Sequence, residues 1–305
     1  MKITVAVHWQ YGTSTHSGWY RGENEDRSLL RIGTSELGDP YAVAIIADGM
    51  GGLGSGAEAS ETALTIVKEW MDDELSGLFS QERPLDELEL RLTQLFAHIN
   101  ARLQQDGAAR DSKMGTTLTV LVLHKETFLI HHIGDCRVYY LKQGGPLKQL
   151  TEDQSWAAEQ VRQGRLSAAQ AAKHPNRHVL LQCLGVQETL HIYSKRGFYD
   201  PYSLFLLCSD GLYRRYKEEE LRRFLTLMDG KNIELQDMSA ALVEKALDRG
   251  ADDNLTLMLI RPVTACSTEK ERRKRAREQF YRQTLPDTGR KAMEQMKSWL
   301  NNLRK

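Results

Sequence analysis

Short acidic motifs follow or precede several predicted strands, where their carboxylates would gather at one end of the fold. They are Glu25-Asp26, Asp48-Gly49, Gly134-Asp135, Ser209-Asp210-Gly211 and Asp252-Asp253-Asn254. Carboxylates gathered without partners repel one another and destabilise a fold, and divalent cations remove that cost. Ligation by carboxylate and carbonyl oxygens suits Mg²⁺ or Mn²⁺ rather than zinc. Asp48-Gly49 taken alone is equally typical of an Asx-type turn, but the recurrence of the motif favours a cation site.

The glycines that follow Asp48 match a dinucleotide-binding fingerprint, which their surroundings contradict. Gly49, Gly51 and Gly54 satisfy GxGxxG. That fingerprint needs a second parallel strand after the helix, ending in an acidic residue about 20 positions on, whereas residues 70–84 are polar and predict no strand. A P-loop is excluded because no GK[ST] follows, and the sequence has no HExxH pair and no GxSxG elbow. We therefore expect the glycines to serve Asp48 by leaving room for a cation and a substrate.

The elements that must position these residues are predicted from the hydrophobic pattern. Strands are predicted at Ile3–Val7, Tyr41–Ala47, Thr117–His124, Thr127–Ile133, Arg137–Leu141, His191–Lys195, Ser203–Cys208 and Leu255–Ile260. Several of these runs are apolar without alternation, which is typical of strands buried on both faces. Helical stripes comprise Ala59, Ala63, Ile66, Val67 and Trp70, and then Leu88, Leu92, Leu95, Ile99 and Leu103 after Pro84. Residues 153–172 and 236–248 also predict helix. The strand meander over 117–141 favours antiparallel pairing, so the predicted class is α+β.

The charge of the chain is balanced only in total. Its 305 residues include 41 basic and 41 acidic side chains. Residues 270–305 hold 12 Lys and Arg against 4 Asp and Glu, a net charge of +8, which leaves 29 against 37 and a net charge of −8 for residues 1–269. An acidic body therefore carries a basic tail, and such asymmetry is a functional hint.

The composition also limits the class of protein. Hydrophobic residues make up 41% and charged residues 27%, which is ordinary for a globular chain and excludes a disordered or collagen-like one. The longest apolar runs are strand-sized, and Ile3–Val7 is too short for a signal peptide. The four cysteines, Cys136, Cys183, Cys208 and Cys266, lack CxxC spacing and predict buried thiols. We therefore expect a cytoplasmic protein.

Seven motifs occur in the order found in the metal-dependent Ser/Thr protein phosphatases, the PPM or type-2C family. They are Arg21–Asp26 (RGENED), Asp48–Gly52 (DGMGG), Gly115–Leu118 (GTTL), Gly134–Arg137 (GDCR), Leu150–Asp153 (LTED), Ser209–Gly211 (SDG) and Asp253-Asn254. The resemblance spans roughly residues 10 to 262. It is strongest to the bacterial branch, which carries Met after the Asp-Gly, as Met50 does here.

The resemblance implies a four-layer α-β-β-α sandwich, in which two central antiparallel sheets are flanked by helices. It also implies a binuclear Mn²⁺ or Mg²⁺ site at one end of the sheets. By position, Asp48 would bridge the two cations and the carbonyl of Gly49 would bind one of them. Asp210 and Asp253 would bind the other. The implied activity is hydrolysis of phosphoserine and phosphothreonine in proteins through a hydroxide that bridges the two metals, without a phosphoenzyme.

Four further residues take implied roles from the same resemblance. Glu25 and Asp26 would hold metal-bound waters. Asp135 would bind a third, weaker metal. Arg21 would grip the substrate phosphate, because its guanidinium can bind two oxygens at once.

The sequence departs from the family at two positions. Met50 stands where animal relatives carry a His proposed as general acid, so a metal-bound water is expected to protonate the leaving group. Gln154 stands where relatives often carry His, which weakens any role for that segment. Residues 156–190, which we call the flap, resemble the family's mobile segment beside the site, and we expect them to influence substrate choice.

We expect a phosphatase domain over residues 1–264 and a basic amphipathic tail over 265–305. The tail has a basic run at 270–277 and an apolar stripe of Ala292, Met293, Met296, Trp299, Leu300 and Leu303. Three interpretations stay open: a solvated tail whose stripe packs on its own domain, a segment that docks on a partner, and a segment that lies on an anionic membrane.

The expected partners are phosphorylated proteins and a cognate Ser/Thr kinase. Nucleic acid is not expected, because the acidic body would oppose it. The alternative function is a catalytically silent relative that binds phosphoproteins as a scaffold. That alternative predicts a lost metal ligand, and each expected ligand residue is present in the sequence.

Overall fold

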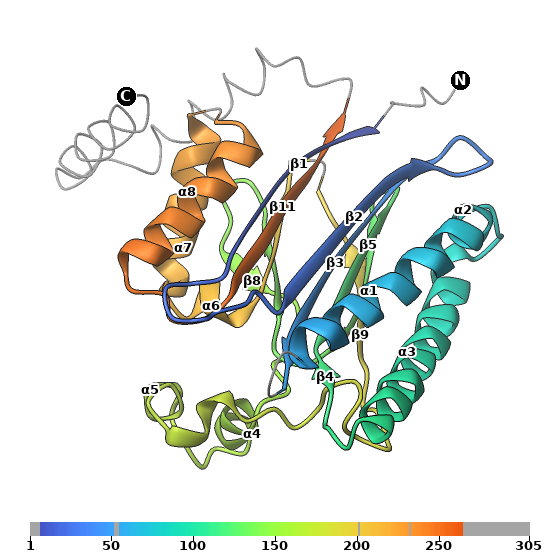
Figure 1. The fold of residues 1–305 in the computed structure, drawn as a ribbon. Helices are drawn as coiled ribbons and strands as arrows, with labels where there is room; N and C mark the ends of the chain where they lie inside the picture. The colour runs from blue at the N-terminus through green and yellow to red at the C-terminus, as the bar shows by residue number, and fades with distance from the viewer. Residues whose placement is uncertain (1–6, 52–54, 201, 232, 265–305) are drawn as a thin grey trace, which may run out of the picture.

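Two antiparallel sheets lie against each other in the computed structural model, which describes residues 7–51, 55–200, 202–231 and 233–264 (Figure 1). The strand order is β1-β11-β10-β7-β8 in the first sheet and β2-β3-β5-β6-β9 in the second, with β4 paired to β3. The first sheet comprises β1 (Val7–His16), β7 (Arg137–Leu141), β8 (Leu147–Gln149), β10 (Leu204–Cys208) and β11 (Leu255–Thr264). The second comprises β2 (Asp26–Thr34), β3 (Pro40–Met50), β5 (Leu118–His124), β6 (Thr127–Ile133) and β9 (Tyr193–Phe198), with β4 at Gly115–Thr116.

Helices cover the outer face of each sheet (Figure 1). On the second sheet lie α1 (Ser55–Asp73) and α3 (Pro84–Ala109), joined by the short α2 (Leu75–Leu78). On the first sheet lie α6 (Asp210–Tyr213), α7 (Glu218–Gly230) and α8 (Leu235–Asp248). The flap contributes α4 (Trp156–Arg162), α5 (Ala168–Ala171) and a 3₁₀ turn at Pro175–His178, beyond one end of the sheets (Figure 1).

Strands β3 and β10 show why the apolar runs do not alternate. Val43 packs against α1 and α3, whereas the next residue, Ala44, packs between the sheets. On β10, Leu206 packs toward α7 and α8, and its neighbour Phe205 lies between the sheets. Both faces of each central strand are therefore buried, in three successive apolar layers. Full burial of one large apolar side chain stabilises the fold by about 1.5–3 kcal/mol.

The predicted fold class is confirmed, and so are the positions of the central elements. The two predicted long helices are α1 and α3, and α3 begins at Pro84 as expected. The predicted helical stretch 153–172 is instead two helices, because Gly164 has a positive φ of 69° and Ser167 begins α5 with a capping box. The sequence pattern misses β2, β4, β8, α2, α6, α7 and the 3₁₀ turn at Pro175–His178.

Some expectations fall partly outside the described residues. Of the strand predicted at Ile3–Val7, residues 3–6 lie outside the described part of the chain. The observed strand β1 begins at Val7 and continues to His16. The tail 265–305 lies wholly outside them, so the domain boundary stays a prediction. Among the helices of the described part of the chain, none has both the length and the apolar character needed to cross a bilayer.

Candidate metal centre

Five predicted aspartates converge at one end of the two sheets. Asp48 lies near the end of β3, and Asp26, the first residue of β2, is its partner in the antiparallel register. Asp210 follows β10 as the first residue of α6, and Asp253 lies two residues before β11. Asp135 lies in the turn that carries the chain from β6 in one sheet to β7 in the other. The cluster therefore spans both sheets.

Three of these carboxylates form a tight group. Asp48, Asp135 and Asp210 each offer one oxygen, and the three oxygens lie within 4.8 Å of one another. Burial, followed by repulsion from neighbouring carboxylates, raises the pKa of Asp48 and of Asp210 well above the ordinary range. Burial also raises the pKa of Asp135 to about 6. A bound cation would reverse these shifts, because it stabilises the ionised carboxylates.

Asp26 presents one oxygen that the protein leaves unpaired. Its Oδ2 accepts a hydrogen bond of 2.7 Å from Ser209 Oγ. Its Oδ1 is buried and has no hydrogen-bond partner among the described residues. Burial raises the pKa of Asp26 to about 6. A buried polar atom without a partner is costly, so Oδ1 is suited to an external ligand such as a cation or its water.

The threonines of the GTTL motif hold the backbone of Asp48. The Asp48 amide donates to Thr117 Oγ1 over 2.9 Å. Its carbonyl accepts bonds from the Thr117 amide at 2.8 Å and from Thr116 Oγ1 at 3.1 Å. These bonds fix the end of β3 and hence the direction of the Asp48 side chain.

Gly49 lies where the backbone of α1 approaches β3. A Cβ atom at Gly49 would lie 2.0 Å from the carbonyl oxygen of Gly56, so only glycine fits. The carboxylate of Glu25 lies against Gly56 and accepts a hydrogen bond from the backbone of Ala57, in the first turn of α1. A carboxylate at a helix N-terminus is stabilised by the helix dipole. Burial nevertheless raises the pKa of Glu25.

Arg21 and Asp253 form an ion pair at the more open side of the centre. Arg21 Nη2 lies 2.9 Å from Asp253 Oδ1, and about half of the Arg21 side chain is exposed. Asn254 holds the loop between β1 and β2, which carries Arg21, beside Asp253. Its Oδ1 accepts a hydrogen bond from the Glu25 amide at 2.8 Å, and its Nδ2 donates to the carbonyl of Ser17 at 2.9 Å. The position of Arg21 therefore depends on the Asp253-Asn254 motif.

Two basic residues without a predicted role lie in the cluster or beside it. Arg214 lies among the carboxylates and pairs with Asp210 at 2.5 Å. Arg137 binds Asp153 through two nitrogens, at 3.0 Å and 2.7 Å, and its guanidinium stacks 3.7 Å above the ring of Tyr213. Arg137 and Asp153 belong to the GDCR and LTED motifs, so their membership in these motifs is the sequence signal that could have identified them. No pattern marks Arg214.

Gln154 has a role that its departure from the family pattern did not indicate. Its Oε1 accepts from the Gly134 amide at 2.8 Å, and its Nε2 donates to the carbonyl of His191 at 2.6 Å. Its own carbonyl accepts from the amide of Leu181 in the flap at 2.8 Å. Gln154 therefore fixes both the turn that carries Asp135 and the base of the flap.

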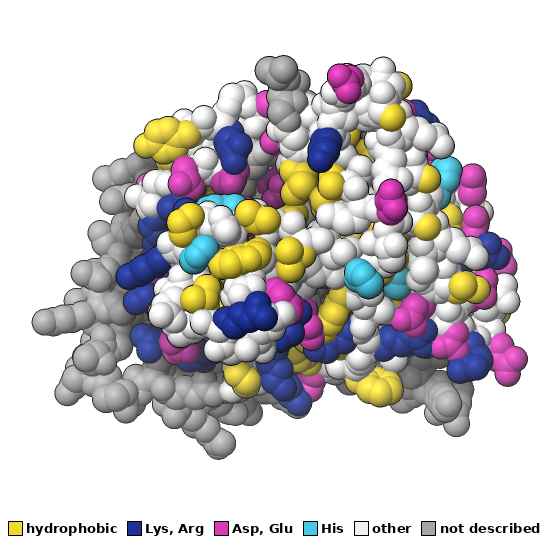
Figure 2. All heavy atoms as spheres, turned by 90° about the horizontal axis from the view of Figure 1, so that it is seen from below, with side chains coloured by type: hydrophobic (Ala, Val, Ile, Leu, Met, Phe, Trp, Pro, Cys, Tyr) yellow, Lys and Arg dark blue, Asp and Glu magenta, His cyan; other side chains and the backbone are white. Residues whose placement is uncertain are grey.

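The surface around this end of the molecule is mixed in character. Figure 2, which looks from the side of the flap, shows hydrophobic side chains gathered among basic, acidic and histidine side chains. Val179 and Leu181 of the flap are among the exposed apolar residues.

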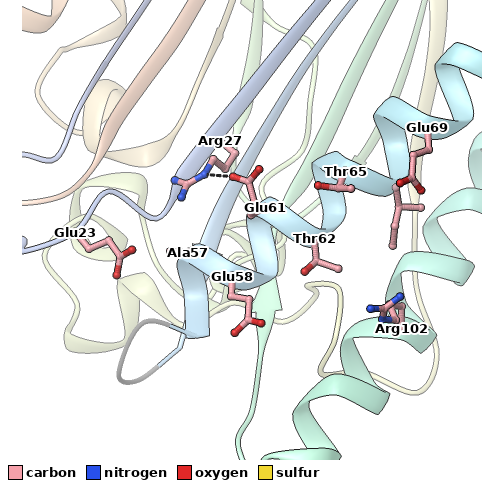
Figure 3. Close-up of a pocket in the computed structure, with 10 residues that line it drawn as sticks. Glu23, Arg27, Ala57, Glu58, Glu61, Thr62, Thr65, Glu69 and Arg102 are labelled. Carbon is pink, nitrogen blue, oxygen red and sulfur yellow. Dashed lines mark hydrogen bonds and ion pairs between the residues drawn. The ribbon is translucent and has the colours of Figure 1, made fainter.

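A separate cavity of about 530 Å³ lies along α1 (Figure 3). Glu23, Glu58, Glu61 and Glu69 line it together with Arg27 and Arg102. Arg27 Nε donates to Glu61 within it, over 2.6 Å. None of the predicted catalytic or metal-binding residues lines this cavity, so it is distinct from the carboxylate cluster.

Comparison with known proteins agrees with this geometry. The family model described as protein phosphatase 2C matches residues 24–247. The serine/threonine phosphatase stp of Listeria welshimeri is 32% identical over 249 residues, which cover 81% of this chain and 93% of that protein.

Two solved structures extend the similarity to the fold. The serine/threonine phosphatase of S. agalactiae superposes with a TM-score of 0.73 and 26% identity, covering 83% of this chain and 99% of that one. The catalytic domain of the phosphatase PstP, solved with two manganese ions, gives a TM-score of 0.65 and 25% identity, covering 85% of this chain and 100% of that one. The family match, the fold and the acidic site agree: this chain belongs to the protein phosphatase 2C family and is a metal-dependent Ser/Thr protein phosphatase of the bacterial type.

Proposed function

We propose that the enzyme hydrolyses phosphoserine and phosphothreonine in proteins at a centre of two Mn²⁺ or Mg²⁺ ions. Asp48, the Gly49 carbonyl, Asp210 and Asp253 would hold the two ions. The observation that carries the proposal is the approach of an oxygen of Asp48 to an oxygen of Asp210, which lie within 4.8 Å of each other although they come from separate segments of the chain. Such a donor set of oxygens alone fits hard divalent cations. The two manganese ions in the PstP catalytic domain support the same choice.

When bound, the cations would neutralise the carboxylates, polarise the phosphate and lower the pKa of a water that acts as nucleophile. The chain's own residues then divide the remaining work. Arg21 is half-exposed at the open side of the cluster, where its guanidinium can turn from Asp253 to grip a phosphate. Asp26 offers its unpaired Oδ1 to accept a hydrogen bond from a water. Glu25 would hold a second water while its carboxylate secures the start of α1.

The same substitution at Asp253 and at its neighbour Asp252 provides a matched test. Asp252 is paired with Arg215 and mostly exposed, whereas the Asp253 side chain is about a quarter exposed and lies in the cluster. Asp253→Asn should lower Mn²⁺ affinity and hydrolysis of a phosphothreonine peptide by more than about 100-fold, because loss of an outer-sphere partner alone costs 10–100-fold. Asp252→Asn should leave both unchanged. Full activity of Asp253→Asn would show that the ligand assignment is wrong.

On the family pattern alone, Asp135 would be the ligand of a third, weaker cation. Equilibrium dialysis against Mn²⁺ would count the ions that the protein binds.

The substrates are proposed to be phosphoproteins that a Ser/Thr kinase of the same cell modifies. We also propose a cytoplasmic location, supported by the free, buried thiols of Cys136, Cys183 and Cys208. Residues 1–264 would form the catalytic domain and the tail 265–305 would act through a partner, an anionic membrane or its own domain. A chain ending at residue 264 should keep its Mn²⁺-dependent hydrolysis. Unchanged partner binding and location in that variant would leave only a packed or solvated tail.

A further inference from the structure

Arg214 lies inside the carboxylate cluster, where a cation would be expected. It directly follows α6, and its amide bonds to the Asp210 carbonyl over 3.1 Å, so the turn of α6 carries its side chain back toward the carboxylate of Asp210. Its Nη2 lies 2.5 Å from Asp210 Oδ2 and 3.6 Å from Asp135 Oδ2. Its Nη1 lies 4.0 Å from Asp253 Oδ2. One guanidinium thus faces three carboxylates that are mostly withdrawn from solvent.

Asp135 is further satisfied by the protein itself. Its Oδ2 accepts a bond from the hydroxyl of Tyr213 at 3.4 Å in addition to its contact with Arg214. The Tyr213 ring is held by the stacked guanidinium of Arg137. Asp26 differs, because its buried Oδ1 has no partner within the described residues. The protein therefore supplies both positive charge and donors at Asp135, but leaves an oxygen of Asp26 for an external ligand.

A third divalent cation bound to Asp135 and Asp210 would lie beside the guanidinium of Arg214, which already contacts one oxygen of each carboxylate. An arginine cannot relieve the resulting repulsion by losing its proton, because its pKa is above 12. Two divalent cations together with Arg21 and Arg214 would carry six positive charges, which already match the six carboxylates of Glu25, Asp26, Asp48, Asp135, Asp210 and Asp253. A third divalent cation would therefore add uncompensated positive charge to the centre.

We propose that Arg214 is a built-in cation of the metal centre, which occupies the Asp135–Asp210 side and limits the enzyme to two divalent ions. The inference rests on the proposed two-cation function and revises only the third-cation assignment of Asp135. Arg214 is a positioning residue here, since it acts through the carboxylates it neutralises.

The number of bound Mn²⁺ ions tests this inference without recourse to activity. The full chain is freed of metal and titrated with Mn²⁺ in a calorimeter, and the bound metal is counted after equilibrium dialysis. Wild type should bind two ions. Arg214→Gln should bind a third ion about 10-fold to 1,000-fold more tightly than wild type, because a charge within 4–6 Å shifts a neighbouring equilibrium by 1–3 log units. Arg215→Ala, which removes a neighbouring arginine paired with Asp252, is the matched control and should still bind two.

A second variant keeps the test decisive if Arg214→Gln fails to fold. Asp135→Asn in the wild-type background should still bind two ions, because Arg214 and not a cation pairs with Asp135. Three ions on wild type, two on a folded Arg214→Gln, or loss of an ion in Asp135→Asn would each overturn the role of Arg214. Fewer than two ions on wild type would instead overturn the two-cation centre itself, and this inference with it. A raised KM for Arg214→Gln with two ions bound would indicate a phosphate contact and would also refute the proposal.

Discussion

Replacing Arg137 with alanine should destabilise the protein far more than removing an exposed arginine. Arg137 donates to Asp153 through Nε and Nη2 and to the Tyr139 hydroxyl at 2.8 Å through Nη1. Its guanidinium also stacks on Tyr213. The side chains of Arg137 and Asp153 are only 26% and 11% exposed. The substitution would leave Asp153 with one side-chain donor in place of three, Nε2 of Gln149.

The expected loss is about 3–5 kcal/mol, the usual cost of removing one partner from a buried ion pair. At roughly 2–4 °C for each kcal/mol in a protein of this size, the melting temperature should fall by about 10 °C. The effect should extend to the metal centre. Tyr213 loses its stacking partner, so its hydroxyl is no longer held in place as a donor to Asp135. Arg137→Lys should fall between wild type and alanine, since lysine keeps the charge but neither the fork nor the stack.

Urea unfolding of the metal-free proteins would measure the difference without a contribution from bound cations. Arg102→Ala is a suitable control, because Arg102 pairs with Asp106 one turn along α3 and is about half exposed. That control should lose less than about 0.5 kcal/mol. An Arg137→Ala variant that loses no more than Arg102→Ala would refute the view that Arg137 holds this corner of the fold.

Three other perturbations have outcomes set by single contacts. Ser209→Ala removes the donor to Asp26 Oδ2 and the acceptor of the Thr256 amide at 2.9 Å, and urea unfolding should show a loss of about 2–4 kcal/mol. Gly211→Ala places a Cβ 2.0 Å from the Asn254 carbonyl and should weaken Mn²⁺ binding in calorimetry, whereas Gly77→Ala, with open space around it, should not. Burial lowers the pKa of His131 to about 4, below an unfolded value near 6.5, so the linked stability is complete above pH 6.5 and is lost as the pH falls toward 4. When the pH is lowered from 8 to 5.5, the free energy of unfolding measured in urea should fall by about 1 kcal/mol less for His131→Gln than for wild type. An equal fall in both proteins would contradict the lowered pKa of His131.

The predictability of each element from sequence follows its burial. The strands β3 and β10 are buried on both faces, so uninterrupted apolar runs identify them. In β2, by contrast, most residues are only partly buried and two arginines interrupt the pattern, Arg27 and Arg31, which pair with acids on α1. Tertiary contacts, not local pattern, therefore make β2 a strand.

The same distinction applies to the metal centre. Aspartates beside strand ends are visible in the sequence, and their chemistry already predicts a divalent cation. That Asp26 lies opposite Asp48 depends on the β2–β3 register, and β2 itself is not predicted. The position of Arg214 depends on the packing of α6 against a turn 79 residues earlier, at Asp135. Such juxtapositions arise only when the two sheets are assembled.

The apolar layer between the sheets has a consequence for the choice of ion. Asp26 and Asp48 belong to one sheet, whereas Asp210 and Asp253 flank strands of the other. The side chains packed between the sheets, Phe205 and Met258 among others, set the spacing of the two sheets and hence of the ligands that each sheet carries. A change in the size of these side chains would therefore change the distance between the two groups of ligands, and with it the ionic radius that the centre accommodates. Evolution could tune the enzyme between a smaller and a larger cation by resizing a hydrophobic residue that touches no metal.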